Sequence, residues 1–280
     1  MTPVIQKFRH LHEQGVFVIP NPWDVGSARW LRGQGFEALA TTSAGFAFTQ
    51  GRADQDVSRD MMLAHIAELV KAVPDTPINA DFENGYADDP DGVAANVKLC
   101  LATGVAGLSI EDATGRSDQP LYEFSHAVER MKAAREAIDG AGSKVMLTGR
   151  AECFLTGHSD ALNEAVKRIA AYADAGADVL YAPGIKTADE IAAIVEAAQG
   201  RPVNMLMFGD LGHTVPQLGA MGVRRISIGA ALARAAWAAL VRATETIVKE
   251  GSFAGFKDNG ASAPLNAFFR SDLKSREDNA

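Results

Sequence analysis

The chain has 280 residues, of which 47% are apolar and 22% are charged, and its formal net charge is −8. This composition is ordinary for a soluble globular protein, and no apolar run approaches the roughly 20 residues that a membrane-spanning helix needs. The negative charge argues against nucleic acid as a partner, because binding to that polyanion relies on clustered Lys and Arg. We therefore expect a small-molecule partner, with neither nucleic acid nor a membrane.

The N-terminal segment, residues 1–7, lacks the basic head and apolar core of a secretory signal, which predicts a cytoplasmic protein. Cys100 and Cys153 are then expected to be reduced, buried thiols. Farther along, Asp24 is in position to cap the helix that follows it.

A βα repeat runs through most of the chain. Several predicted helices end at a glycine that leads into a short apolar segment, as at Gly35, Gly104, Gly176 and Gly222. Glycine ends a helix by adopting the left-handed conformation at low cost, and a continuous apolar strand suits a parallel sheet that is buried on both faces. The pattern predicts eight strands, at residues 16–19, 38–42, 78–81, 107–110, 145–148, 179–182, 203–207 and 225–228.

Predicted helices alternate with these strands, at residues 61–73, 92–103, 127–138, 161–175 and 188–198. Eight strands alternating with helices predict an α/β fold of the (β/α)₈ TIM-barrel type. A doubly wound open sheet is the alternative.

The last part of the chain has a different character. Residues 230–250 predict one long Ala-rich helix, residues 251–260 contain glycines, and residues 264–269 form a short apolar patch. We expect residues 1–250 to form the catalytic barrel domain and residues 251–280 to form a C-terminal extension. Its apolar patch is expected to cover a surface of the same or a neighbouring subunit, and the polar residues after Arg270 are expected to be frayed.

Charged residues follow the predicted strands, at the end of a TIM barrel where catalytic groups lie. Asp81 and Glu83 end the third strand, and Glu111 and Asp112 end the fourth. Closely packed carboxylates repel one another unless a cation offsets their charge, and oxygen ligands favour Mg²⁺ or Mn²⁺. Solvated loop acids are the alternative to this metal site.

Arg150 follows the fifth strand at the same predicted rim. Its planar guanidinium could bind a substrate carboxylate through two hydrogen bonds. The alternative is a salt bridge to Glu152 or Glu111.

These motifs resemble the isocitrate lyase and phosphoenolpyruvate mutase superfamily. The core motif of that superfamily, Asp-Ala-Asp-Thr-Gly-Tyr-Gly, is similar to Asp81-Phe82-Glu83-Asn84-Gly85-Tyr86-Ala87. Further elements agree in order and spacing, namely Thr42-Ser43-Ala44-Gly45, Gly51-Arg52-Ala53-Asp54, Ile110-Glu111-Asp112 and Gly149-Arg150-Ala151-Glu152. The resemblance covers roughly residues 15–250.

The resemblance implies a division of roles. Asp81 would be the nearest metal ligand, and the residues that hold metal-bound waters would be Asp54, Glu83 and Glu111. The substrate would be held by Ser43, by the backbone near Ala44 and Gly45, by Arg150, and by Asn204 on the seventh strand. The superfamily also exchanges its eighth helix between subunits, which implies a helix-swapped homodimer or homotetramer.

The loop after the fourth strand, residues 113–122, departs from the superfamily. It has neither the Cys and His of the isocitrate lyase lid nor the Lys and Asn of the mutase lid. For proton transfer the remaining candidates are Tyr86, His158 and His213, each of which has a structural alternative as a packing, capping or solvated residue. The other histidines, His10, His12, His65 and His126, are expected to be structural.

We therefore expect a Mg²⁺-dependent lyase that cleaves a C–C bond in a small 2-oxo or 2-hydroxy dicarboxylate, by retro-aldol cleavage or decarboxylation through a metal-stabilised enolate. The catalytic candidates are Arg150, Glu111, Tyr86 and His213. One alternative is a P–C bond mutase or hydrolase that acts on a phosphonopyruvate-like substrate. Another is a non-catalytic protein that binds 2-oxo acids.

Overall fold

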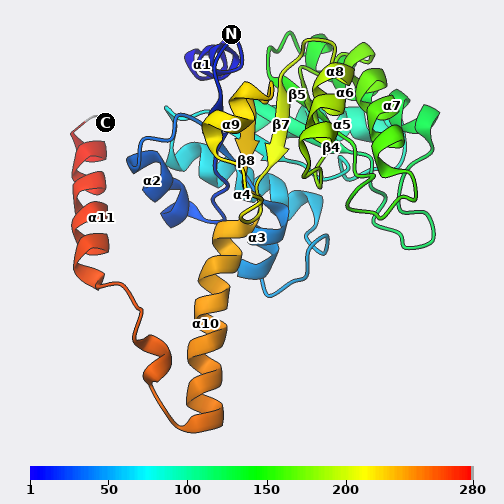
Figure 1. Ribbon diagram of the computed structural model, residues 1–280. Coiled ribbons are helices and arrows are strands. Elements are labelled where there is room, and N and C mark those ends of the chain that lie inside the picture. Colours follow the sequence, from blue (N-terminus) through cyan, green and yellow to red (C-terminus); the bar gives the residue numbers. More distant parts are fainter. Residues whose placement is uncertain (279–280) are drawn as a thin grey trace.

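The structure, a computed structural model that describes residues 1–278, is an almost closed barrel of parallel strands surrounded by helices (Figure 1). The strands are β1 Phe17–Ile19, β2 Leu39–Ala40, β3 Ile78–Asp81, β4 Gly107–Glu111, β5 Met146–Arg150, β6 Val179–Tyr181, β7 Val203–Leu206 and β8 Arg225–Ser227. The helices are α1 Pro3–Leu11, α2 Val25–Gly33, α3 Ser43–Thr49, α4 Arg59–Ala72, α5 Pro90–Ala102, α6 Phe124–Gly140, α7 Ala161–Asp174, α8 Ala188–Ala197, α9 Val215–Ala220, α10 Ala231–Glu250, the 3₁₀ turn η1 Ala254–Phe256 and α11 Ser262–Glu277.

The order of the strands confirms the (β/α)₈ prediction and excludes the doubly wound alternative. Neighbouring strands pair in the order β1-β8-β7-β6-β5-β4-β3-β2, so the first strand meets the last. Between β1 and β2 the ladder is replaced by single bonds: the Ala40 amide donates to the Pro20 carbonyl at 3.0 Å, and Asn21 Nδ2 donates to the Thr41 carbonyl at 2.8 Å.

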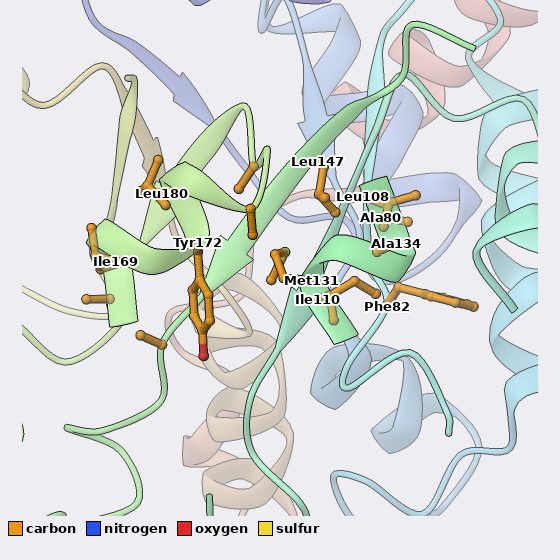
Figure 2. Packing of buried hydrophobic residues seen from close by; sticks show 14 of the residues in the cluster. Ala80, Phe82, Leu108, Ile110, Met131, Ala134, Leu147, Ile169, Tyr172 and Leu180 are labelled. Carbon is orange, nitrogen blue, oxygen red and sulfur yellow. The ribbon is translucent and has the colours of Figure 1, made fainter. Parts of the chain in front are cut away.

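The main core lies between the outer faces of the strands and the helices that cover them (Figure 2). Ile110 and Leu147 point outward from their strands and belong to the same buried cluster as Met131 on α6 and Ile169 on α7. Cys100 and Cys153 are buried in this cluster as free thiols, as expected. Because strand residues alternate in direction, the residues between these outward ones point into the barrel and are available to line a site.

Helix α1 closes the N-terminal end of the barrel. Thr2 caps the helix by accepting a hydrogen bond from the Ile5 amide, and Phe8 is fully buried in a cluster with Ile19 and Val179. Gly107 leaves the space that Phe8 needs, since a Cβ there would lie 2.6 Å from the Phe8 ring. The floor of the barrel is therefore filled, and access to its interior is from the carboxyl ends of the strands.

The C-terminal helices extend beyond the barrel. Helix α10 projects from the carboxyl end, and α11 returns beside α2 of the same chain (Figure 1). Phe268 fits over Gly33, where a Cβ would lie 2.3 Å from its ring, and Arg29 forms a 3.0 Å ion pair with Asp272. The prediction of frayed residues after Arg270 is wrong as far as Glu277, because this helix has a docked aromatic and ionic face; residues 279–280 lie outside the described residues.

Within residues 1–278, no helix combines the length and the apolar character that crossing a bilayer requires.

Two buried histidines predict a loss of stability in acid. Burial lowers the pKa of His12 to about 3 and that of His65 to about 4, whereas an unfolded histidine titrates near ~6.5. The unfolded chain therefore takes up protons first. The stability that these two neutral histidines contribute is fully present above pH ~6.5, and it is lost as the pH falls towards their pKa values in the folded protein. We expect urea titrations to show a steep loss of unfolding free energy over this range.

His65 stacks on Phe46 with ring centroids 3.9 Å apart, so His65→Phe keeps an aromatic ring but removes the titration. Between pH ~6.5 and ~4, the unfolding free energy of this variant should fall by roughly 2–3 kcal/mol less than that of the wild type. The same change at exposed His10 is the control. Equal pH slopes for His65→Phe and wild type would contradict the assignment.

Candidate active site

One pocket of about 480 Å³ opens at the carboxyl end of the barrel and reaches down into its interior. Its upper part is acidic, with five carboxylate residues, Asp54, Asp81, Glu83, Glu111 and Glu152. Its lower part is polar, with the residues Asn79, Ser109, Asn204, Arg225 and Ser227. TIM-barrel interiors are usually filled by branched apolar side chains, so this polar interior marks the pocket as the candidate site.

Asp81, at the end of β3, is held in place by the start of α3. Its Oδ2 accepts hydrogen bonds from the Ser43 amide at 3.0 Å and from the Ser43 hydroxyl at 2.9 Å. Its own amide donates to the Thr41 hydroxyl at 2.8 Å. Thr42 begins α3 by capping the Gly45 amide, which fixes the turn that presents Ser43. The carboxylate of Asp81 is therefore oriented before any ligand binds.

Arg150, at the end of β5, lies among three of the acids. Its Nη1 is 2.9 Å from Glu111 Oε2 and 3.4 Å from Asp81 Oδ1, and its Nε donates to Glu152. Both of the salt bridges that the sequence offered as the structural alternative are therefore present. Burial raises the pKa of the Glu111 carboxyl and of the Glu152 carboxyl, although the Arg150 guanidinium opposes that rise.

Glu83 lies on a strained loop after β3. Glu83 and Tyr86 have φ angles of 45° and 54°, in the left-handed region that non-glycine residues rarely adopt. Arg130, which is buried on α6, holds this loop by donating to the Ala87 carbonyl at 2.8 Å and to the Asn84 carbonyl. Such strain persists where the surroundings over-determine the backbone, and it concentrates at functional sites.

The donor set fits a hard cation that keeps much of its water. Glu83 Oε1 is buried without a hydrogen-bond partner, and burial together with the nearby Asp81 raises the pKa of the Glu83 carboxyl to about 7. Five acids and three arginines line the pocket, which leaves an excess of negative charge that a divalent cation would offset. Among residues 1–278, no three His, Cys, Asp or Glu side chains are close enough to enclose a metal directly, so water would supply most of the ligands, as Mg²⁺ prefers.

Asp112 points away from the pocket, although it follows Glu111 in the sequence. Its Oδ2 accepts hydrogen bonds from Tyr172 and, at 3.0 Å, from Arg168, and its Oδ1 accepts from the Glu152 amide at 2.8 Å. Alternation along β4 sends neighbouring side chains to opposite faces. Asp112 therefore anchors the loop that carries Glu152 and is not one of the pocket acids.

The pocket brings together most of the residues that the sequence predicted for the site. These are Ser43, Ala44, Asp54, Asp81, Glu83, Glu111, Arg150 and Asn204. Gly45 does not line the pocket, and a Cβ there would be 2.5 Å from the Thr42 methyl. Tyr86 lies beside Glu83, and burial together with the Glu83 carboxylate raises the pKa of its hydroxyl.

The two histidine candidates lie outside this pocket. His213 Nε2 is 3.1 Å from the Lys186 carbonyl, and His158 accepts a hydrogen bond from the Asp160 amide. Conversely, the pocket contains Ser109, Tyr181, Arg225, Ser227 and Arg234, which the sequence did not single out. The available signal was the alternation on the strands, since Ser109 and Glu111 must share a face.

The loop after β4, residues 113–122, is closed by hydrogen bonds between its own backbone groups. Ala113 and Leu121 form an antiparallel bridge, and the Thr114 amide donates to the Pro120 carbonyl at 3.0 Å. Arg116 ties the loop to Asp88 with a 3.0 Å ion pair. Only Ala113 of this loop lines the pocket, so the loop contributes no acid or base to it.

Comparisons with known proteins agree with this geometry. The family described as phosphoenolpyruvate phosphomutase matches residues 8–248. A crystal structure of a provisionally assigned lyase/mutase from Burkholderia cenocepacia J2315 is 47% identical, with a TM-score of 0.90, over 95% of this chain and 96% of that one. A crystal structure of 2,3-dimethylmalate lyase is 26% identical, with a TM-score of 0.85, over 100% and 99% of the two chains. Oxaloacetate decarboxylase of Rhodopseudomonas palustris (strain ATCC BAA-98 / CGA009) is 29% identical over 79% of this chain and 73% of its own length.

The contacts of Asp112 predict a structural role. Asp112→Asn should lower the unfolding free energy by roughly 3 kcal/mol, because it leaves buried Arg168 with less compensation. Tyr172→Phe, which removes one hydroxyl from the same group, should cost about 1.5 kcal/mol. Urea denaturation measures both changes. Unchanged stability of Asp112→Asn with loss of Mg²⁺-dependent ligand binding would instead place Asp112 at the metal.

Proposed function

The chain belongs to the phosphoenolpyruvate phosphomutase family of the isocitrate lyase and phosphoenolpyruvate mutase superfamily, and from this premise we propose that it is a Mg²⁺-dependent carbon–carbon lyase. Its substrate would be a small 2-oxo or 2-hydroxy dicarboxylate, cleaved by retro-aldol cleavage or decarboxylation. Mn²⁺ could replace Mg²⁺, because both ions accept the same oxygen ligands.

The observation that carries this proposal is the convergence of Asp81, Glu111 and Arg150 at one end of a deep polar pocket. A cation there would be held directly by Asp81, and through water by Asp54, Glu83 and Glu111. When bound, it would supply stabilisation of the negative charge that develops on a 2-oxo acid as the C–C bond breaks.

The side chains of the chain itself would supply orientation. Ser43 already fixes Asp81 at 2.9 Å and would fix the nearby carboxylate of the substrate together with the backbone of Ala44. Arg150 contacts both Glu111 and Asp81 through its Nη1 and would stabilise negative charge beside them. Tyr86 would position Glu83 by contact with its side chain. His213 lies outside the pocket, and we assign it no contact with substrate.

The loop composition supports a lyase over the alternatives. Residues 113–122 have no Lys or Asn for a migrating phosphoryl group, which disfavours mutase or hydrolase action on a phosphonopyruvate-like substrate. They also lack a Cys or His that could serve as a general acid, which favours decarboxylation, a reaction that releases the enolate without one. A non-catalytic protein that binds 2-oxo acids is the remaining alternative, and a turnover assay separates it from the lyase.

For assembly, we propose a homodimer or homotetramer in which the barrel, residues 1–250, is completed by a partner that covers α10. One stripe of this helix is exposed and apolar, with Trp237, Val241 and Val248 exposed by 41%, 47% and 84%. The names of the relatives state small carboxylate substrates, and the resemblance to the superfamily implies an oligomer. Residues 251–280 would then support the interface between subunits. The part of this extension that packs on its own barrel is α11, which contacts α2.

Turnover tests the proposed function. Purified protein with Mg²⁺ should release a 2-oxo acid from at least one of oxaloacetate, methylisocitrate and dimethylmalate, whereas turnover of phosphonopyruvate alone would favour the P–C alternative. Asp81→Ala should abolish Mg²⁺-dependent binding of oxalate, an enolate mimic, and leave the melting temperature within a few degrees of wild type. Inactivity on the whole panel with tight oxalate binding would favour the binding protein, and unchanged oxalate affinity in the variant would remove Asp81 from the metal site.

Light scattering after size exclusion tests the assembly. The wild type should have the mass of two or four chains, and Trp237→Glu with Val241→Glu should reduce it, because charges on the stripe prevent its burial. Arg242→Glu, on another side of the same exposed helix, is the control and should keep the wild-type mass. A monomeric wild type would exclude the proposal.

A further inference from the structure

A second arginine lies below the acidic group, inside the barrel. Arg225, the first residue of β8, is 3% exposed and lines the lower part of the pocket. Its Nε donates to Asn204 Oδ1 at 2.8 Å, its Nη2 to the Thr148 hydroxyl at 3.2 Å, and its Nη1 to Asn79 Oδ1 at 3.4 Å. All three acceptors are neutral.

Arg150 and Arg225, two of the three arginines that line the pocket, therefore differ in charge compensation. Arg150 has three carboxylates within ion-pair distance, whereas Arg225 has none among residues 1–278. Burial lowers the pKa of Arg225 to about 10, which still leaves it charged at neutral pH. A buried cation without an anion is costly, and hydrogen bonds to neutral groups offset that cost only in part.

The position of Arg225 relative to the acids follows from the strands. It contacts Asn79, two residues before Asp81 on β3, and Thr148, two residues before Arg150 on β5. Two strand residues span about 7 Å. The guanidinium thus lies one such step below both Asp81 and Arg150, along the axis of the same pocket. That separation suits the two ends of a small dicarboxylate.

We propose that Arg225 binds the second carboxylate of the substrate, at the end of the pocket opposite to Asp81. This assignment rests on the proposed function and adds to it a residue that selects dicarboxylates over monocarboxylates. Asn204 is then a positioning residue, because its Oδ1 orients the Arg225 guanidinium and its Nδ2 donates to the Ser227 hydroxyl at 2.9 Å. The second carboxylate of the substrate would supply the negative charge that Arg225 lacks in the protein alone.

Two substitutions remove the free charge in different ways. Arg225→Met deletes the guanidinium. Asn204→Asp keeps the shape of the side chain and places a carboxylate on Arg225 at the distance of the present 2.8 Å bond, so it neutralises the arginine without opening a cavity. Arg224→Met is the matched control, since Arg224 precedes Arg225 on the chain but donates to the Gly15 carbonyl outside the pocket.

The measurement uses full-length protein with Mg²⁺ and three stable probes, oxalate, lactate and malate, by calorimetry or by displacement of oxalate. Lactate and malate share the 2-hydroxy acid group and differ in the second carboxylate. The wild type should bind malate at least about tenfold more tightly than lactate, the range expected for a charge-assisted contact. In Arg225→Met and in Asn204→Asp this ratio should fall to about one to two, because the affinity for malate falls more than the affinity for lactate. Arg224→Met should keep the full ratio.

Each other outcome overturns the assignment. Equal binding of malate and lactate by the wild type, an unchanged ratio in folded Asn204→Asp, or the same loss in Arg224→Met would each remove Arg225 from this role. If oxalate still binds with Mg²⁺ in those cases, the proposed function stands without Arg225. If the wild type binds none of the three probes, the proposed function fails with it.

Discussion

Pairing between β4 and β5 places Glu111 directly opposite Arg150, and the rest of the site depends on this pair. Because the backbone ladder fixes the register, the 2.9 Å contact between the two side chains does not depend on flexible loops. The same guanidinium also reaches Asp81 and Glu152, which gives a group of acids one shared internal cation. The three arginines of the pocket do not offset its five acids, so an excess of negative charge remains that a bound divalent cation would offset.

The surrounding structure keeps this acidic group in place. Three of its members have separate supports: Asp81 is fixed by Ser43 at the start of α3, Glu83 by a strained loop that Arg130 holds, and Glu152 by the bond from its amide to Asp112. These supports are hydrogen bonds, and removing one partner of a buried hydrogen bond leaves the other partner unsatisfied, which costs free energy. Repulsion among the acids would otherwise separate them, so the supports and the site form one energetic unit.

The sequence was sufficient for the barrel and for the residues that end its strands, because glycine punctuation and short apolar segments are local signals. It placed β3 at Ile78–Asp81 without error and recognised the motif around Glu83. The residues by themselves did not distinguish Glu111 from Asp112, and only the superfamily resemblance singled out Glu111, because the opposite directions of the two side chains follow from the exact phase of β4. The sequence missed α1, which depends on the contact of Phe8 with the distant Gly107. It expected residues 264–269 to cover a surface, but it did not identify that surface as α2, where Phe268 packs over Gly33.

Arg225 shows most clearly why the lower half of the site was not predictable. In the sequence it is the second of two adjacent arginines at the start of a short strand, and either could face solvent. Only closure of the barrel, which brings β8 beside β7 and within reach of β3 and β5, surrounds it with Asn204, Asn79 and Thr148. Charge in this pocket is therefore arranged along its axis, acidic at the mouth and basic at the floor. A ligand that brings a cation to one end and a free carboxylate to the other would satisfy both.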